Sequence, residues 1–84
     1  MKQPERIEID LEAQASYVYY SDADVAETID VLRDGAVAAD LDAKGNVIGI
    51  ELLGFESDVI ECARGYAASH DLGFPPGLNG SFVA

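Results

Sequence analysis

Apolar and polar residues alternate along much of the first fifty residues of the chain, with the period of two that is typical of half-buried β-strands. The pattern is clearest in residues 35–54, where two apolar runs flank a polar turn at 42–46. Gly45 stands in that turn where a chain reversal requires a positive φ. This segment therefore predicts a β-hairpin. The residues expected on one face of each arm are Val37, Ala39 and Leu41, and Ile48, Ile50 and Leu52.

The register of this hairpin has two solutions. A bulge at Gly45 pairs Asp42 with Asn46 and shifts the two apolar faces by one residue. A loop with an even number of residues instead brings the apolar faces into register. We favour matched faces.

Three further strands are predicted before the hairpin, in residues 5–11, 15–20 and 25–32. Pro4 precedes the first of them and favours an edge position, because proline cannot donate a ladder hydrogen bond. The residues before Pro4 form a short leader that we expect to fray. The second strand places Tyr17 and Tyr19 on one side. The third has Ile29 and Val31 inward, although the acidic residues at its start also allow a short helix.

After the hairpin the apolar period changes to about three and a half residues, which predicts a helix over residues 57–72. Ser57 is the expected N-cap residue, and Gly73 is the expected left-handed residue after the last turn. Residues 74–84 form a turn-rich tail. The tail is either disordered or docks on the body through Phe82 and Val83.

These elements predict one α+β domain spanning residues 1–84. A small antiparallel sheet of four or five strands in residues 7–54 is followed by a C-terminal helix that packs on one face. Tyr17 and Tyr19 then lie on the uncovered face. An aromatic open face on a small domain favours a homodimer or the binding of another protein.

Charge is the one compositional outlier, because sixteen acidic residues face five basic ones and the formal net charge is −11. Nucleic-acid binding needs clustered Lys and Arg, which the sequence lacks, and an anionic membrane repels the chain for the same reason. The charge confers solubility and attracts a basic partner protein. Asp22, Asp24, Glu27 and Asp30 form an acidic run that is either a solvated edge or a docking strip for such a partner.

The composition also indicates a compartment. No apolar run reaches the roughly 18 residues of a membrane span, and the first ten residues lack the apolar core of a signal peptide. A single cysteine gives no disulfide framework. We therefore expect a cytoplasmic protein.

Two segments resemble a known family. Residues 10–18, DLEAQASYV, and residues 40–53, DLDAKGNVIGIELL, resemble the small bacterial and archaeal proteins catalogued as domain of unknown function 2283. The resemblance spans about residues 7–54, with Gln14 at a usually acidic position and Ser16 at a usually apolar one. The family has no established activity, so the resemblance implies no catalytic residues. Some members lie beside genes for toxin-like proteins, which implies an antitoxin-like role.

The hairpin carries a partial calcium motif. Asp40, Asp42 and Glu51 have the spacing of positions 1, 3 and 12 of a calcium-binding loop, with Gly45 at position 6. Lys44 stands at position 5, where a cation opposes the metal. The flanks also predict strands, whereas the motif needs helices. We interpret these acids as a solvated turn and expect no metal site.

Two other residues bear on catalysis. His70 has no second base and no nucleophilic serine pattern, and a histidine near a helix C-terminus is favoured by the helix dipole. Cys62 has no neighbouring base and is interpreted as a small buried apolar residue. We therefore expect no catalytic residue and no cofactor.

The sequence favours a non-enzymatic protein-interaction domain that self-associates. An antitoxin-like neutraliser of a basic toxin partner is the alternative within the same class. A small metal-dependent or hydrolytic enzyme is the contrasting hypothesis and is disfavoured for want of a site. The residues expected to make the interaction are Tyr17, Tyr19, Asp22, Asp24 and Glu27.

Overall fold

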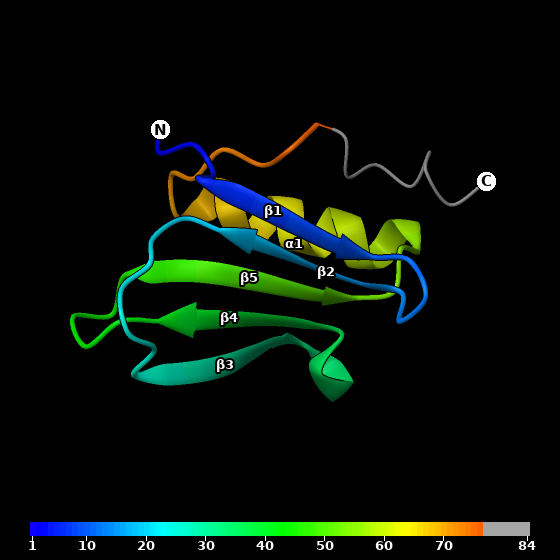
Figure 1. The fold of residues 1–84 in the computed structure, drawn as a ribbon, viewed down its shortest axis with the longest axis horizontal. Coiled ribbons are helices and arrows are strands. Elements are labelled where there is room, and N and C mark those ends of the chain that lie inside the picture. Colours follow the sequence, from blue (N-terminus) through cyan, green and yellow to red (C-terminus); the bar gives the residue numbers. More distant parts are fainter. Residues whose placement is uncertain (77–84) are drawn as a thin grey trace.

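The computed structural model describes residues 1–76, which form a five-stranded antiparallel sheet with one helix behind it (Figure 1). The elements are β1 (Arg6–Asp10), β2 (Ala15–Tyr19), β3 (Glu27–Leu32), the short 3₁₀ turn η1 (Arg33–Gly35), β4 (Val37–Leu41), β5 (Val47–Leu53) and α1 (Ser57–Ser69). The strand order is β1-β2-β5-β4-β3, so β5 is central and β1 and β3 are the edges. The predicted α+β fold and the edge position of the first strand are confirmed. Phe82 and Val83, on which the choice between a docked and a disordered tail depends, lie outside the described residues.

The β4–β5 hairpin combines both register solutions. The N–H of Asp42 donates to the carbonyl oxygen of Asn46 at 2.9 Å. The loop between these two residues therefore has an odd number of residues, and the predicted loop with an even number is wrong. The register then shifts between Asp40 and Leu41, where Ile48 is the extra residue of a bulge in β5. Beyond the bulge the apolar pairs are Val37 with Leu52 and Ala39 with Ile50. The bulge therefore restores the matched apolar faces that the sequence predicts.

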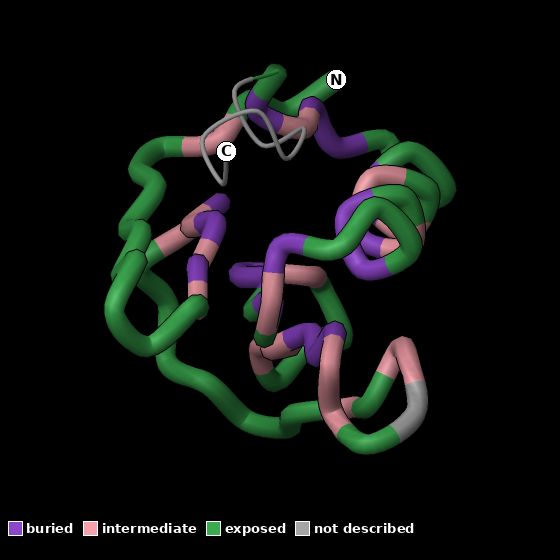
Figure 2. The backbone as a smooth tube through the Cα atoms, turned by 90° about the vertical axis from the view of Figure 1, so that its right-hand side faces the viewer, coloured by how far each residue is buried: buried purple, intermediate pink, exposed green. Residues whose placement is uncertain are grey.

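The core lies between the sheet and the helix, which packs against β3, β4 and β5. The largest fully buried side chains of the sheet layer are Val18, Tyr20, Val37, Ile50 and Leu52, and α1 adds Val59, Ile60, Ala63 and Ala67. Figure 2 shows buried segments in the strands of the sheet and on the part of the helix nearest to them. Ile7 pairs with Val18 and therefore faces the same side of the sheet, yet 41% of it is exposed. The helix thus leaves the core side of β1 uncovered.

The third strand is shorter than predicted, since it begins at Glu27 rather than at residue 25. It is a strand and not a helix. A register shift between Asp30 and Leu32 leaves Val31 without a partner in the ladder, and both Val31 and Leu32 pack against the core. Ser16 on β2 is only 3% exposed, and its hydroxyl has no hydrogen-bond partner among the described residues.

The helix ends three residues earlier than predicted, at Ser69. Asp71, with φ 58°, takes the left-handed position that the sequence predicts for Gly73. An aspartate tolerates this conformation better than most residues because its side chain is short and polar. The N–H of Leu72 then donates to the carbonyl oxygen of Ala67 at 2.8 Å, and the buried Leu72 completes a Schellman closure.

The start of the helix also differs from the prediction. Glu56 occupies the N-cap position without a side-chain cap hydrogen bond, and Ser57 is the first helical residue. Instead, the carboxylate of Asp58 accepts a hydrogen bond from the N–H of Val59 at 3.0 Å. The carboxylate also suits the positive end of the helix.

The N-terminal leader is held rather than frayed. The N–H of Lys2 donates to the carbonyl oxygen of Asp71 at 3.2 Å, and the N–H of Gly73 donates to the carbonyl oxygen of Lys2 at 2.7 Å. Figure 1 shows the two segments side by side. The buried Tyr20 hydroxyl donates to the carbonyl oxygen of Gly73 at 2.7 Å. The leader, β2 and the segment after α1 are therefore joined.

Gly45 provides a test of the turn. Its φ is +83°, and the space around it is open, so an added methyl group meets strain only in the backbone. We expect Gly45→Ala to lower the free energy of unfolding by about 1–2 kcal/mol. Gly65→Ala is the matched control, because Gly65 lies in α1 with open space around it and an ordinary φ. This substitution should raise the free energy of unfolding by up to about 1 kcal/mol. Urea denaturation measures both, and equal effects would contradict the turn geometry.

Tyr20 makes the stability dependent on alkaline pH. Burial raises the pKa of Tyr20 to about 12, above the ordinary value of about 10. The folded state therefore favours the neutral phenol, and this contribution is complete below pH 10 and is lost as the pH rises toward 12. We expect Tyr20→Phe to cost about 1–3 kcal/mol at pH 7, because the Gly73 carbonyl loses its partner. Above pH 10 its stability should fall less steeply than that of the wild type. Urea denaturation from pH 7 to 11.5 measures both slopes, and parallel slopes would refute the role of Tyr20.

Candidate functional site

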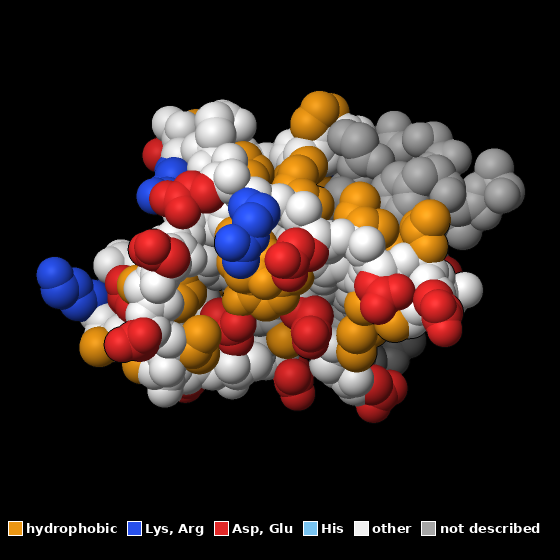
Figure 3. Space-filling view, viewed as in Figure 1, with side chains coloured by type: hydrophobic (Ala, Val, Ile, Leu, Met, Phe, Trp, Pro, Cys, Tyr) orange, Lys and Arg blue, Asp and Glu red, His pale blue; other side chains and the backbone are white. Residues whose placement is uncertain are grey.

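The face of the sheet opposite α1 carries Tyr17 and Tyr19, as the alternation in β2 predicts. Their ring centroids lie 4.3 Å apart and their planes are tilted by 48°. Figure 3 views this open face, where acidic side chains surround the hydrophobic and tyrosine side chains. The open face is therefore an aromatic centre within a negatively charged surface.

Tyr17 crosses the central strand of the sheet. Its hydroxyl donates to the Asp40 carboxylate on β4, and the second oxygen of that carboxylate accepts the hydroxyl of Thr28. The path runs over Gly49 of β5, where any side chain would overlap the Tyr17 ring. Burial first, and the Asp40 carboxylate second, raise the pKa of Tyr17 above its ordinary value. Tyr17 is thus fixed as a neutral ring that joins three strands.

Tyr19 is held from the other side by β1. Its hydroxyl donates to Glu8 at 2.7 Å. The guanidinium carbon of Arg6 lies 3.9 Å from the centre of the Tyr19 ring, which is a cation–π geometry. The Nε atom of Arg6 is also 3.8 Å from the Glu8 carboxylate. The open face therefore already holds one guanidinium between an aromatic ring and a carboxylate.

A groove of about 270 Å³ runs between the two tyrosines and the β2–β3 connection. We call it the tyrosine groove and define it by Arg6, Tyr17, Tyr19, Asp22 and Val25, which line it. Val25 is 53% exposed, so the wall of the groove is apolar and open to solvent. The structure thus brings together three of the predicted interaction residues, the two tyrosines and Asp22.

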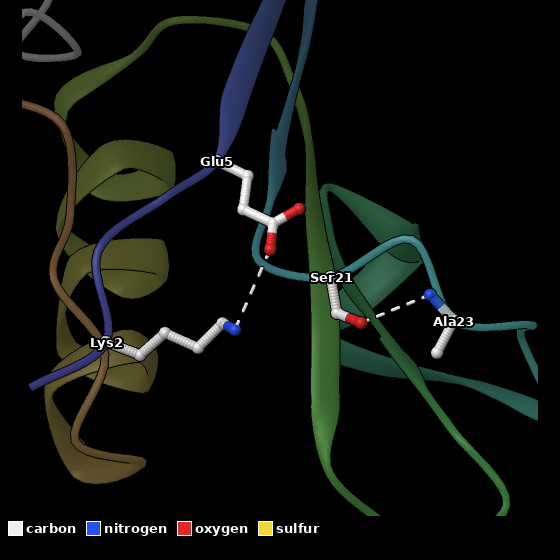
Figure 4. A network of polar contacts seen from close by, with 4 residues as sticks. All are labelled: Lys2, Glu5, Ser21 and Ala23. Atoms are coloured by element: carbon white, nitrogen blue, oxygen red, sulfur yellow. Dashed lines mark hydrogen bonds and ion pairs between the residues drawn. The ribbon is translucent and has the colours of Figure 1, made fainter.

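Polar contacts shape the rim of this groove (Figure 4). The hydroxyl of Ser21 accepts the N–H of Ala23 at 3.1 Å, which turns the connection out of β2. Glu5 forms an ion pair with Lys2 at 3.8 Å. Both Glu5 and Ser21 line the groove.

The other two predicted interaction residues lie outside the groove. Asp24 is exposed and lines a separate shallow hollow with Asp42 and Lys44 of the hairpin turn. Glu27 is exposed at the start of β3. The acidic run is therefore divided between the groove and one end of the sheet.

The three carboxylates of the calcium motif have separate contacts. Asp40 accepts hydroxyl groups on the open face, and Glu51 lies opposite Tyr17. Asp42 accepts the backbone N–H groups of Lys44 and Asn46, each at 2.9 Å. The bond from Asn46 is the main reason that the pKa of Asp42 lies below its usual range. Within residues 1–76, no group of three or more His, Cys, Asp or Glu side chains is placed to hold a metal ion.

A second hollow of about 380 Å³ includes Lys2 and His70 among its lining residues. The Nδ1 atom of His70 lies 2.9 Å from the carbonyl oxygen of Tyr66 and 3.1 Å from the hydroxyl of Ser69. The Ser69 hydroxyl donates its proton to that same carbonyl, so it forms no nucleophile–base pair with His70. Cys62 is partly buried against the core.

Sequence reasoning did not find the contact between Tyr17 and Asp40. The available signal was Gly49 within an otherwise apolar strand, because an interior glycine marks a close approach of another group. Arg6 was likewise missed as a ring partner of Tyr19. Both contacts depend on which strands are neighbours.

Gly49 offers a test of the crossing. We expect Gly49→Ala to lower the free energy of unfolding by about 1–3 kcal/mol, because the methyl group displaces the Tyr17 ring. The pKa of Tyr17 should then fall toward its ordinary value, which absorbance titration measures. In a Tyr17→Ala background the same substitution should be neutral or stabilising, because alanine suits a strand better than glycine. An equal cost in both backgrounds would contradict the crossing.

Comparisons with known proteins bear on this surface. In the described part of the chain, no helix is long and apolar enough to cross a membrane. No curated protein and no solved structure matches the chain. A family model described as protein of unknown function (DUF2283) matches residues 6–55, which contain all five strands and therefore the whole open face. α1 begins beyond the matched residues. The chain belongs to the DUF2283 family.

Proposed function

We propose that the chain is a non-enzymatic protein-interaction domain whose tyrosine groove binds an arginine- or lysine-bearing segment of a basic partner protein. One observation carries this proposal: Arg6 already lies over Tyr19, with its guanidinium carbon 3.9 Å from the ring centre and Glu8 beside it. A cation over a tyrosine ring is attracted by the negative face of the ring. The half-buried Tyr17–Tyr19 pair provides aromatic surface of the same kind to a second cation from a partner.

The charge of the chain supports a basic partner. Carboxylates surround the aromatic pair on the open face, and the formal net charge is −11. The carboxylates of this surface with described contacts or pairings include Glu8, Asp10, Asp30, Asp40 and Glu51. Such a field steers a positively charged protein to the groove and repels anionic partners.

The dimensions of the groove favour a side chain over a metabolite. Its volume of about 270 Å³ lies just below the roughly 300–1,000 Å³ of small-molecule sites, and it is open to solvent. Its two hydroxyl-bearing rings already donate their protons to Asp40 and Glu8. These features support binding and not catalysis.

Neutralisation of a basic toxin-like protein is the specific form of this proposal that the family resemblance implies. Asp22 lies in the groove, and Asp24 and Glu27 follow it along the β2–β3 connection and into β3. A partner that occupies the groove would therefore meet further carboxylates in this direction. This arrangement suits a basic segment of several residues.

Titration of the ¹⁵N-labelled protein with a tetra-arginine peptide tests the groove. We expect the largest amide shifts at Tyr17, Tyr19, Asp22 and Val25, with smaller changes at acids elsewhere. Tyr19→Ser should weaken binding about two- to fivefold, the contribution of one exposed cation–π contact. Shifts spread evenly over all the acids would refute a defined site.

Two matched controls separate the groove from general charge. Asp22→Asn and Glu12→Gln each remove one exposed carboxylate, and Glu12 lies in the turn between β1 and β2. Only Asp22→Asn should weaken peptide binding. Tyr66→Ser on α1 is the control for Tyr19→Ser and should leave the affinity unchanged.

A further inference from the structure

The outer edge of β1 has no covering element among the described residues. All five residues of the strand are exposed, and its neighbour in the sheet is β2 alone. An edge strand of this kind presents unpaired N–H and C=O groups to another chain. The strand therefore has the backbone groups needed to extend the sheet.

The core side of the same strand is apolar and open. Ile7 and Ile9 are 41% and 46% exposed, and Leu11 just beyond them is 61% exposed. Ile7 and Ile9 lie on the side of the sheet that α1 covers over β3, β4 and β5. A second element beside β1 would remove these side chains from water.

The sequence of β1, Arg-Ile-Glu-Ile-Asp, is complementary to itself when read in opposite directions. In an antiparallel pair centred on Glu8, Arg6 lies opposite Asp10 of the second copy, and Ile7 lies opposite Ile9 of the second copy. Opposite charges and apolar side chains in directly opposed positions both stabilise an antiparallel pair. We propose that β1 pairs with β1 of a second copy of this chain in this register, with a two-fold axis at Glu8.

The two-fold axis determines how the faces join. Opposed residues of an antiparallel pair lie on one side of the sheet, so Ile7 and Ile9 of both copies meet on the helix side. The tyrosine grooves of both copies remain on the open side. This interface uses the outer edge of β1, whereas the groove lies between the tyrosines and the β2–β3 connection, and Arg6 is the residue of β1 that belongs to both.

Glu8 is the one unfavourable pair in this arrangement, because it faces Glu8 of the second copy. Within each chain the Tyr19 hydroxyl donates to Glu8 at 2.7 Å, and Arg6 lies 3.8 Å from it, which offsets part of the repulsion. The net charge of −11 also opposes association. Screening over roughly 8 Å at physiological ionic strength reduces this long-range repulsion.

The opposite edge of the sheet lacks these properties. The register of β3 shifts between Asp30 and Leu32, and a bulge of this kind interrupts pairing with another strand. Its sequence, Glu-Thr-Ile-Asp-Val-Leu, contains acids and no base, so no self-pairing register joins opposite charges. The pairing is therefore specific to β1.

Charge reversal tests the register. The wild type should sediment as a dimer at micromolar concentration. Arg6→Asp and Asp10→Arg should each raise the dimer dissociation constant by about tenfold, because each places like charges opposite one another. The double variant Arg6→Asp/Asp10→Arg should restore the wild-type value. Circular dichroism checks the fold of each variant, since Asp10 also accepts the N–H of Ala13 in the turn.

Asp10→Arg distinguishes the register from net charge. This variant lowers the overall negative charge, so general repulsion predicts a tighter dimer whereas the proposed register predicts a weaker one. A tighter dimer, or no recovery in the double variant, would overturn the proposal. A monomeric wild type would also overturn the proposal. This holds equally if the β1 amides of that monomer are protected from hydrogen exchange because another part of the chain covers them.

A crosslink provides a second measurement that does not depend on affinity. In a Cys62→Ala background, Glu8→Cys places two thiols directly opposite each other at the axis, and oxidation should give a covalent dimer. Glu51→Cys, on the open face away from the axis, should form no covalent dimer under the same oxidation. Equal crosslinking of both variants would refute the axis at Glu8.

Discussion

The buried hydroxyl of Tyr20 holds the two layers of this protein together. It donates to the carbonyl oxygen of Gly73, and the backbone N–H of Tyr20 donates to Ile48 in the central strand. The N–H of Gly73 in turn donates to Lys2. One fully buried side chain therefore connects the sheet, the segment that closes the helix and the N-terminal leader. A small core contains few such contacts, so each one carries a large share of the stability.

The arrangement of the tyrosines on the open face depends on the absence of a side chain at Gly49. Because Gly49 carries no Cβ, Tyr17 lies flat across the central strand and reaches Asp40. Tyr19 stacks beside it, with Arg6 over its outer face. The rings are thus fixed by polar contacts at their hydroxyl groups, and both side chains stay half-buried at the surface. A rigid aromatic surface with a charged surround loses little conformational entropy on binding, which suits an interaction surface.

One helix is too narrow to cover all five strands of the sheet that it packs on, and this mismatch determines what the molecule exposes. α1 packs on β3, β4 and β5, so the apolar residues Ile7 and Ile9 of β1 stay partly in water. The two edges of the sheet differ as a result: β3 is bulged and acidic, whereas β1 is regular and self-complementary. The groove and the outer edge of β1 share Arg6 and otherwise consist of different residues.

The sequence by itself determined the elements, because strand alternation, turn glycines and helical spacing act between residues close in the chain. The period of two placed Tyr17 and Tyr19 on the open face. Only the tertiary structure decided what those rings touch, since the contact of Tyr17 with Asp40 spans 23 residues and requires that β5 lie between their strands. It also placed Asp71 rather than Gly73 in the left-handed position, because the helix ends at Ser69, and Gly73 instead bonds to Lys2 and Tyr20. Which apolar residues stay exposed was likewise decided by where the helix lies, and no local pattern encodes that position.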